Sequence, residues 1–187
     1  LGDIQKFSKP LIQNQAASAW TIEDKSFNQN IMCVEFHTKA NALNSLAMEI
    51  LYEAVELTDK HNADGLVVYN EAMNFSAGAD LNTLIGLADD ENWQGIDLYL
   101  SSFQNACSLM KYAPFPTVSA ISGLAIGGGF EVACQSDRMV AHMNSTVGLV
   151  ETGVGLVPGG GGCKELLWRW VQDSKFHDNH DNAAIEV

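Results

Sequence analysis

The chain has 187 residues, of which 47% are apolar and 18% are charged, a composition that excludes extensive disorder. This length suits one domain and is enough to bury a sizeable core. Ten Lys and Arg residues against 23 Asp and Glu residues give a formal net charge of −13. We therefore predict no binding to nucleic acid or to a membrane surface, because both generally need a basic protein surface.

The predicted elements begin after a polar leader or linker over residues 1–30. A helix that Asn44 or Ser45 caps is predicted from apolar residues at three- and four-residue steps. The other elements expected from such patterns are strands at 31–37, 65–69, 117–121, 138–142 and 146–150, and helices at 93–110, 130–134 and 164–171. Residues 172–187 form a polar tail that we expect to be disordered, so the core spans 31–171 and is α/β.

The four cysteines are Cys33, Cys107, Cys134 and Cys163, and none lies in a C-x-x-C pair or near a histidine at zinc-site spacing. We interpret them as free thiols of a reducing compartment and expect a cytoplasmic location and no metal site. No apolar run reaches the roughly 18 residues that span a bilayer. The chain starts without Met or a signal-peptide pattern, which suggests a piece of a longer polypeptide.

Two glycine-rich blocks, Gly127–Gly129 and 159–162, fit neither the dinucleotide fingerprint nor the Walker pattern. The first block lies between a strand and a helix, so it presents unobstructed N–H groups at a helix N-terminus. Such donors can receive a carbonyl that becomes an oxyanion during a reaction. The small-residue segment Ala77–Ala79 is the candidate for a second donor.

Three acidic residues have both a structural and a catalytic interpretation. Glu131 lies three residues after Gly128, where a glutamate commonly hydrogen-bonds back to the helix cap. Glu151 follows an apolar strand, and its structural interpretation is a solvated residue at the strand end. Asp80 fits a helix N-cap better than an acid catalyst. Spacing alone favours the structural interpretation for all three.

Taken together, four segments in this order resemble the crotonase (enoyl-CoA hydratase/isomerase) superfamily. They are Asn41–Asn44, Phe75–Leu81, Gly123–Glu131, and Glu151 seven residues before Pro158–Gly161. The G-A-D and G-G-G-x-E segments are the specific part of this resemblance, which extends over most of the chain. It implies a spiral of ββα units that is truncated at its C-terminus relative to the family.

The resemblance also implies the substrate and the site. The substrate would be an acyl-CoA thioester, with coenzyme A as part of the substrate and no separate cofactor. The backbone N–H groups of Ala79 and Gly128 would form the oxyanion hole. The assembly would be a homotrimer or hexamer. The further residues that the resemblance assigns to substrate binding are Ala40, Ala42, Leu43, Ala77, Gly78, Asp80, Leu81, Gly127, Val154 and Gly159.

The two glutamates favour one activity within the superfamily. Hydratases that look like this chain carry glutamates at both positions, whereas simple isomerases commonly keep only the later one. We therefore expect a 2-enoyl-CoA hydratase of fatty-acid β-oxidation, with Glu131 deprotonating the attacking water and Glu151 protonating the α-carbon. The alternatives are a Δ3-Δ2-enoyl-CoA isomerase and a non-catalytic acyl-CoA-binding or assembly module.

Two further expectations concern partners of the site. The phosphates of coenzyme A need cations despite the net charge of −13, and Lys39, Lys111 and Lys164 are the candidates within the chain. The N-terminal stretch looks like that of bifunctional β-oxidation proteins, in which a 3-hydroxyacyl-CoA dehydrogenase part precedes the hydratase part. A covalently linked dehydrogenase domain is therefore predicted, although no dinucleotide fingerprint occurs in this chain.

Overall fold

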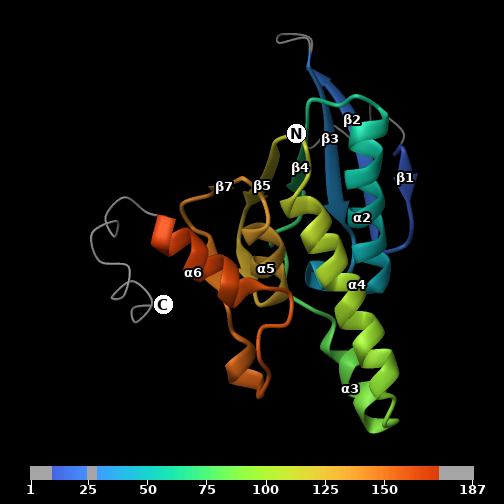
Figure 1. Cartoon of the computed structure of the whole chain (residues 1–187), viewed down its shortest axis with the longest axis vertical. Helices are drawn as coiled ribbons and strands as arrows, with labels where there is room; N and C mark the ends of the chain where they lie inside the picture. Colours follow the sequence, from blue (N-terminus) through green and yellow to red (C-terminus); the bar gives the residue numbers. More distant parts are fainter. Residues whose placement is uncertain (1–9, 25–28, 173–187) are drawn as a thin grey trace.

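The computed structural model describes residues 10–24 and 29–172 as two sheets with helices around them (Figure 1). The strands are β1 (Ile12–Gln13), β2 (Ala17–Asp24), β3 (Gln29–Phe36), β4 (Gly65–Tyr69), β5 (Thr117–Ile121), β6 (Leu124–Ile126), β7 (Arg138–Ala141) and β8 (Thr146–Gly148). The helices are η1 (Lys39–Asn41), α2 (Ser45–Lys60), α3 (Leu81–Asp89), α4 (Trp93–Lys111), α5 (Gly128–Cys134), η2 (Glu151–Val154) and α6 (Gly162–Gln172), of which η1 and η2 are short 3-10 helices.

The large sheet has the order β1-β2-β3-β4-β5-β7, and β3, β4, β5 and β7 run parallel. In successive turns of the spiral, a short extended segment lies outside the large sheet and forms a second, smaller layer. This layer contains the parallel pair β6-β8 and the isolated parallel bridges Leu43–Ala79 and Ser76–Ala125. The predicted α/β spiral of ββα units is therefore confirmed, and the small layer brings residues distant in sequence to one edge.

The prediction of a leader over residues 1–30 is wrong for the residues that form β1 and β2. β2 pairs antiparallel with β3 along its whole length, from Ala17–Phe36 to Asp24–Gln29. Ala16, Ala17 and Ala19 are almost fully buried, because α2 packs over this part of the sheet. Alanine and serine carry little hydropathy contrast, so the strand pattern is faint in the sequence. Gln172 ends α6, and the rest of the predicted tail lies outside the described residues.

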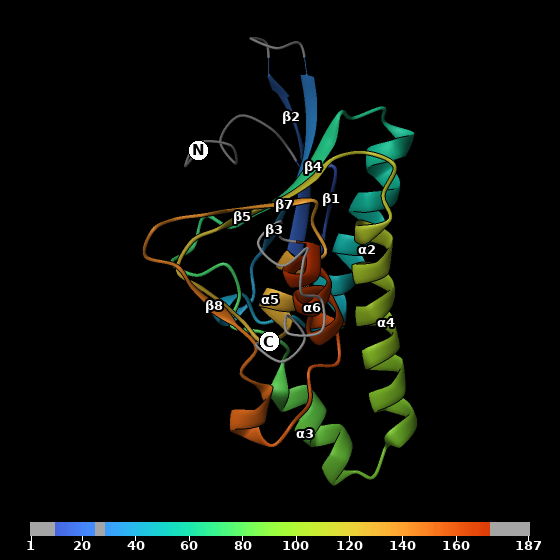
Figure 2. The same ribbon diagram turned by 60° about the vertical axis from the view of Figure 1, so that its left-hand side comes forward.

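The helices α2 and α4 lie side by side and cover one face of the large sheet (Figures 1 and 2). Asn44 caps α2 as predicted, since its side chain accepts a hydrogen bond from the Ala47 amide. Asp80 caps α3 as predicted, although no bounds were predicted for this helix. The apolar steps that predicted α4 lie on its buried side at Phe103, Cys107 and Met110, whereas Trp93 at its start is 65% exposed.

The C-terminal part of the described chain is much less covered. All seven residues of α5 are buried, and α6 packs against this helix. By contrast, none of the residues of β7, β8 and η2 is buried. Within residues 10–24 and 29–172, no helix combines the length and apolarity needed to cross a bilayer.

Candidate functional site

The two amides predicted to form an oxyanion hole lie next to each other at the edge of the small layer. A Cβ atom built on Gly128 would lie 3.1 Å from the Ala79 nitrogen. One built on Gly78 would lie 3.4 Å from the Gly128 nitrogen. The small residues singled out in the sequence therefore allow two backbone segments to approach closely.

The direction of each amide follows from the planar trans peptide, in which N–H and C=O point to opposite sides. The Gly78 carbonyl accepts a hydrogen bond from the Leu43 amide at 2.8 Å, so the Ala79 N–H points away from Leu43. The Gly127 carbonyl accepts from the Glu131 amide at 2.9 Å, so the Gly128 N–H points out of α5. Neither amide has an acceptor among the described residues, which leaves both available to a ligand.

Gly127 is the point at which the chain turns from β6 into α5. Its φ of 52° and ψ of −130° belong to a backbone region that glycine adopts far more readily than other residues. A Cβ built there would also lie 3.2 Å from Glu151 Oε1. Glycine is therefore required both for the turn and for the approach of Glu151.

Glu131 is 3% exposed and is held by the second glycine block. Its Oε1 accepts hydrogen bonds from the Gly160 and Gly162 amides, both at 2.8 Å. The capping interpretation of Glu131 is therefore wrong, because the carboxylate receives amides 29 and 31 residues away. Burial raises the pKa of Glu131, the neighbouring Glu151 carboxylate raises it further, and the amide hydrogen bonds oppose this rise.

Glu151 is the first residue of η2 and is half-buried. Its Oε2 atom is shielded from solvent and has no hydrogen-bond partner within the described part of the chain. The interpretation as a solvated residue is therefore wrong for this oxygen. A buried polar atom without a partner is unfavourable, so the oxygen is suited to accept a donor from water or a substrate.

These positions give a site with two amide donors and two carboxylates of different character. Two amides anchor Glu131, whereas Glu151 is half-buried with one oxygen that has no partner in the described structure. The Glu151 charge is close enough to raise the pKa of Glu131. Such an arrangement can stabilise an oxyanion while one acid removes a proton and the other supplies one.

The predicted substrate-binding segment 40–43 pairs with residues 77–80, the oxyanion segment, which contains the candidate donor Ala79. The Ala77 amide donates to the Ala40 carbonyl at 3.1 Å, and the Asp80 amide donates to the Leu43 carbonyl at 2.9 Å. Ala42 is half-buried in this segment, whereas the Leu43 side chain is fully buried in the core. The assignment of Leu43 to substrate contact is therefore wrong, because its backbone and side chain are both used internally.

The other predicted binding residues are spread along the rim of the site. The Asp80 carboxylate caps α3 by accepting from the Asn82 amide, and Leu81 is 38% exposed. Val154 is 57% exposed on η2. The Gly159 carbonyl accepts from Gln104 Nε2 at 2.7 Å. In the sequence, these residues lie within three positions of Ala79, of Glu151 or of the loop that holds Glu131. Their contact with a substrate stays a prediction.

Two of the lysines predicted to neutralise phosphate are already paired. Lys164 lies 3.0 Å from the buried Glu165 carboxylate, and Lys111 donates a hydrogen bond to the same carboxylate. Both cations therefore compensate an internal charge, and only Lys39 of the three candidates stays without such a pairing in the described structure. Contact of these lysines with phosphate stays a prediction.

Tyr99, Ser76 and Phe103 surround the site and were not assigned to it from the sequence. Ser76 Oγ donates to the Asn41 carbonyl at 2.7 Å and accepts from the Gly78 amide at 3.1 Å. Phe103 packs beneath Gly128. The only sequence signal was the spacing of Tyr99 and Phe103, which share a helix face four residues apart.

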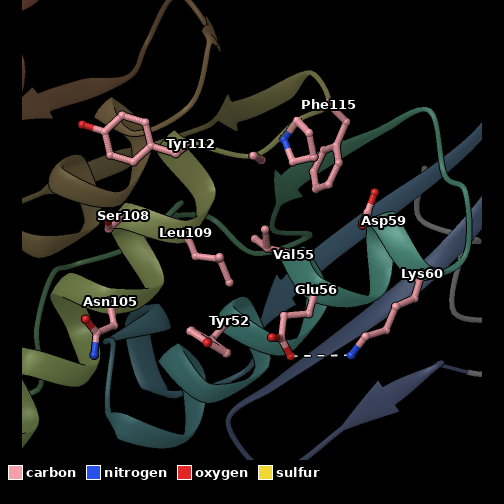
Figure 3. A pocket seen from close by; sticks show the side chains of 12 residues that line it. Tyr52, Val55, Glu56, Asp59, Lys60, Asn105, Ser108, Leu109, Tyr112 and Phe115 are labelled. Carbon is pink, nitrogen blue, oxygen red and sulfur yellow. Dashed lines mark ion pairs between the residues drawn. The ribbon is translucent and has the colours of Figure 1, made fainter.

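A hollow of about 670 Å³ lies elsewhere, between α2 and α4 (Figure 3). Its wall includes Tyr52, Leu109 and Phe115 and the ion pair of Glu56 with Lys60, which is 3.8 Å long. No predicted site residue lines it. This hollow therefore does not mark the chemistry, which the amides and carboxylates locate.

Comparison with known proteins agrees with these features. The sequence profile of the enoyl-CoA hydratase/isomerase family matches residues 26–178. A Bacillus subtilis protein named "probable 3-hydroxyacyl-CoA dehydrogenase" is 35% identical over 95% of this chain and 21% of its own length. A Rickettsia felis protein, whose name describes a trifunctional enzyme of a fatty acid oxidation complex, is 34% identical over 89% of this chain and 22% of its own length.

The chain thus spans about a fifth of the length of these curated relatives. Among solved structures, an enoyl-CoA hydratase from Polaromonas sp. JS666 superposes with a TM-score of 0.74 and 22% identity. The match covers 84% of this chain and 60% of that one. This likeness shows a shared fold.

Proposed function

The chain belongs to the enoyl-CoA hydratase/isomerase family, and we propose that it adds water to 2-enoyl-CoA thioesters, giving 3-hydroxyacyl-CoA in fatty-acid oxidation. The observation that carries this proposal is the pair of acids beside the two outward-pointing amides. An isomerase needs to move one proton between two carbons, whereas hydration needs a base for water and an acid for carbon. Two coupled carboxylates fit the second requirement better.

In the proposed reaction, the thioester oxygen lies against the Ala79 and Gly128 amides. Glu131 takes a proton from water, and the hydroxyl oxygen forms a bond to the β-carbon. The electron pair of the double bond moves toward the thioester, and the amides stabilise the resulting enolate oxygen. Glu151 gives its proton to the α-carbon, so that one water has been added. Transfer of a proton from Glu131 to Glu151 through solvent restores the starting state.

The division of roles between the acids follows from their surroundings. Two amides hold one oxygen of Glu131 and fix the orientation of this base, while burial raises its pKa and so strengthens its affinity for the proton of water. The second oxygen of this carboxylate is left to accept the proton of water. Glu151 Oε2 has no such donor in the described part of the chain, so this oxygen is free to face the substrate and deliver a proton.

The test is an absorbance assay of crotonyl-CoA hydration with Glu131→Gln and Glu151→Gln, and with Glu53→Gln on the exposed face of α2 as a matched control. Each site variant should lose at least about 10²-fold in turnover, while the control keeps wild-type activity. Near-wild-type hydration by either site variant would overturn the proposal. If Glu131→Gln converts a 3-enoyl-CoA substrate into the conjugated 2-enoyl form, the protein is an isomerase. If the wild type binds the thioester without turnover, it is a non-catalytic module.

We further infer a linked dehydrogenase and a trimeric or hexameric assembly in the cytoplasm. The names of the two relatives and the small share of their length that this chain spans support the first inference. Purification of the whole protein, followed by a 3-hydroxyacyl-CoA oxidation assay and a mass measurement in solution, tests both. A monomer that lacks dehydrogenase activity would contradict them.

A further inference from the structure

Tyr99 on α4 makes a buried polar contact with the oxyanion segment. Its side chain is almost fully buried, and its hydroxyl donates a hydrogen bond to the Leu43 carbonyl at 2.6 Å. The same oxygen accepts a hydrogen bond from the Asp80 amide at 3.2 Å. Burial raises the pKa of Tyr99 to about 12, so the hydroxyl keeps its proton and its donor role at ordinary pH.

This contact acts on both sides of the Ala79 amide. The Leu43 amide holds the Gly78 carbonyl, which belongs to the same peptide group as the Ala79 N–H. The Leu43 carbonyl holds the amide of Asp80, the next residue along the chain. Because a peptide group is planar, a shift of Leu43 changes the direction in which the Ala79 N–H points. Tyr99 is the side chain that ties this backbone pair to a long helix.

The same helix supports the second amide one turn further on. A Cβ atom built on Gly128 would lie 3.1 Å from the Phe103 ring, and one built on Gly160 would lie 2.5 Å from it. Phe103 therefore packs under the segment of Gly128 and under the loop that holds Glu131. Residues four apart lie on the same face of a helix. One face of α4 therefore contacts the backbone segments of both amides.

We propose that Tyr99 is a positioning residue of the oxyanion site, whose hydroxyl keeps the Ala79 amide in line with the Gly128 amide. The inference rests on the proposed thioester chemistry. The hydroxyl does not touch the substrate; it acts through the backbone of Leu43 and Asp80. Its effect is largest in the transition state, because the amides bind the enolate oxygen more strongly than the ground-state carbonyl.

The test is Tyr99→Phe in the whole protein, with Tyr112→Phe as the matched control at the C-cap of the same helix, where the residue is 72% exposed. We expect kcat to fall about tenfold in Tyr99→Phe with KM changed less than about twofold, since loss of a complete oxyanion donor costs about 10²–10³. Hydrogen exchange of residues 76–81 should become faster. The control should match the wild type in all three measurements.

A spectroscopic probe separates positioning from a general loss of packing. A conjugated enoyl thioester bound to Glu131→Gln, which does not turn it over, should shift its absorbance band to the red as the amides polarise its carbonyl. Adding Tyr99→Phe should reduce that shift at saturating ligand, whereas a merely structural role would change affinity or melting and leave the shift intact.

The outcomes distinguish this inference from the proposed function. An unchanged kcat, an undiminished band shift, or slow exchange of residues 76–81 in Tyr99→Phe would overturn the positioning role. Absence of turnover and of a band shift with the wild-type oxyanion site would overturn the proposed function, and with it the assignment of Tyr99 to an oxyanion site. A reduced kcat in Tyr112→Phe as well would also overturn the inference, because any ring hydroxyl on α4 would then have the same effect.

Discussion

The segments that carry the two acids differ sharply in how they are held. Glu131 lies in α5, where every residue is buried and the carboxylate receives two backbone amides. Glu151 opens η2, where no residue is buried, and its shielded oxygen has no partner in the described structure. One acid is positioned by the core, and the other by a single turn at the surface.

This difference fits the different roles that we propose for the two acids. A general base profits from a fixed orientation toward the proton that it removes. A proton donor profits from an oxygen that no other group holds, and Glu151 Oε2 is such an oxygen among the described residues. The comparison predicts that α5 and the loop after η2 tolerate little change, whereas η2 itself tolerates substitutions that leave Glu151 in place.

The largest expected effect tests how firmly Glu131 is held. In Gly160→Ala, the new Cβ would lie 2.5 Å from Phe103 and 2.8 Å from Glu131 Oε2, so the carboxylate must move. Turnover should fall about 10²-fold, because small displacements of a catalytic group are costly. In the control Gly86→Ala on α3, the Cβ meets nothing within 4 Å, and activity should stay within about threefold. Equal activities would show that Glu131 is not held in place by this loop.

The same substitution in both segments compares their packing directly. Gly129→Ala places a Cβ 2.6 Å from the Ser76 side chain and should lower the free energy of unfolding by about 1–3 kcal/mol. Gly153→Ala meets nothing within 4 Å and should change it by less than about 0.5 kcal/mol. Urea denaturation measures both, and a comparable loss in Gly153→Ala would mean that η2 is covered in solution.

A third variant tests the contact between α6 and α4 that supports the glycine loop. Burial pushes the pKa of Glu165 upward, but hydrogen bonds from Lys111 and Lys164 outweigh it and leave the pKa lowered. The carboxylate therefore stabilises the fold above its unfolded pKa of about 4.3, and this contribution is lost as pH falls through the lower folded pKa. Glu165→Gln should cost about 1–3 kcal/mol at pH 7, with a smaller cost in acid. A cost that is independent of pH would contradict this.

The smallest expected effect concerns Glu131, whose contribution to stability changes with pH in the opposite direction to that of Glu165. Its raised pKa means that ionisation opposes folding, so its favourable contribution is present at low pH and is lost as pH rises through the folded pKa. Glu131→Gln should therefore become more stable relative to the wild type as pH increases from about 4 toward 8. Melting temperatures of the two proteins over this range measure the trend, and a widening deficit of the variant at high pH would contradict it.

The sequence was sufficient for the parts of the site that depend on short motifs. Small residues at Ala77–Ala79 and Gly127–Gly129 predicted two accessible backbone segments, and the structure brings their amides together. The strands and helices from β3 to α6 were largely predictable from apolar periodicity, except for β6 and α3. The strand β2 was not, because its buried residues are Ala17, Ser18 and Ala19 besides Trp20, and small residues carry no strong pattern.

By itself, the sequence determined the α/β class, the alternation of elements, the small-residue segments and the two candidate acids, because each depends on neighbours along the chain. Only the tertiary structure decided what holds those groups: the Gly160 and Gly162 amides on Glu131, Tyr99 against Leu43, and Glu165 as the partner of two lysines. The contacts of Glu131, Tyr99 and Lys111 join residues 29–56 positions apart. Lys164 is adjacent to Glu165 and pairs with the same carboxylate that Lys111 reaches. No local pattern encodes them, since they arise when the turns of the spiral stack.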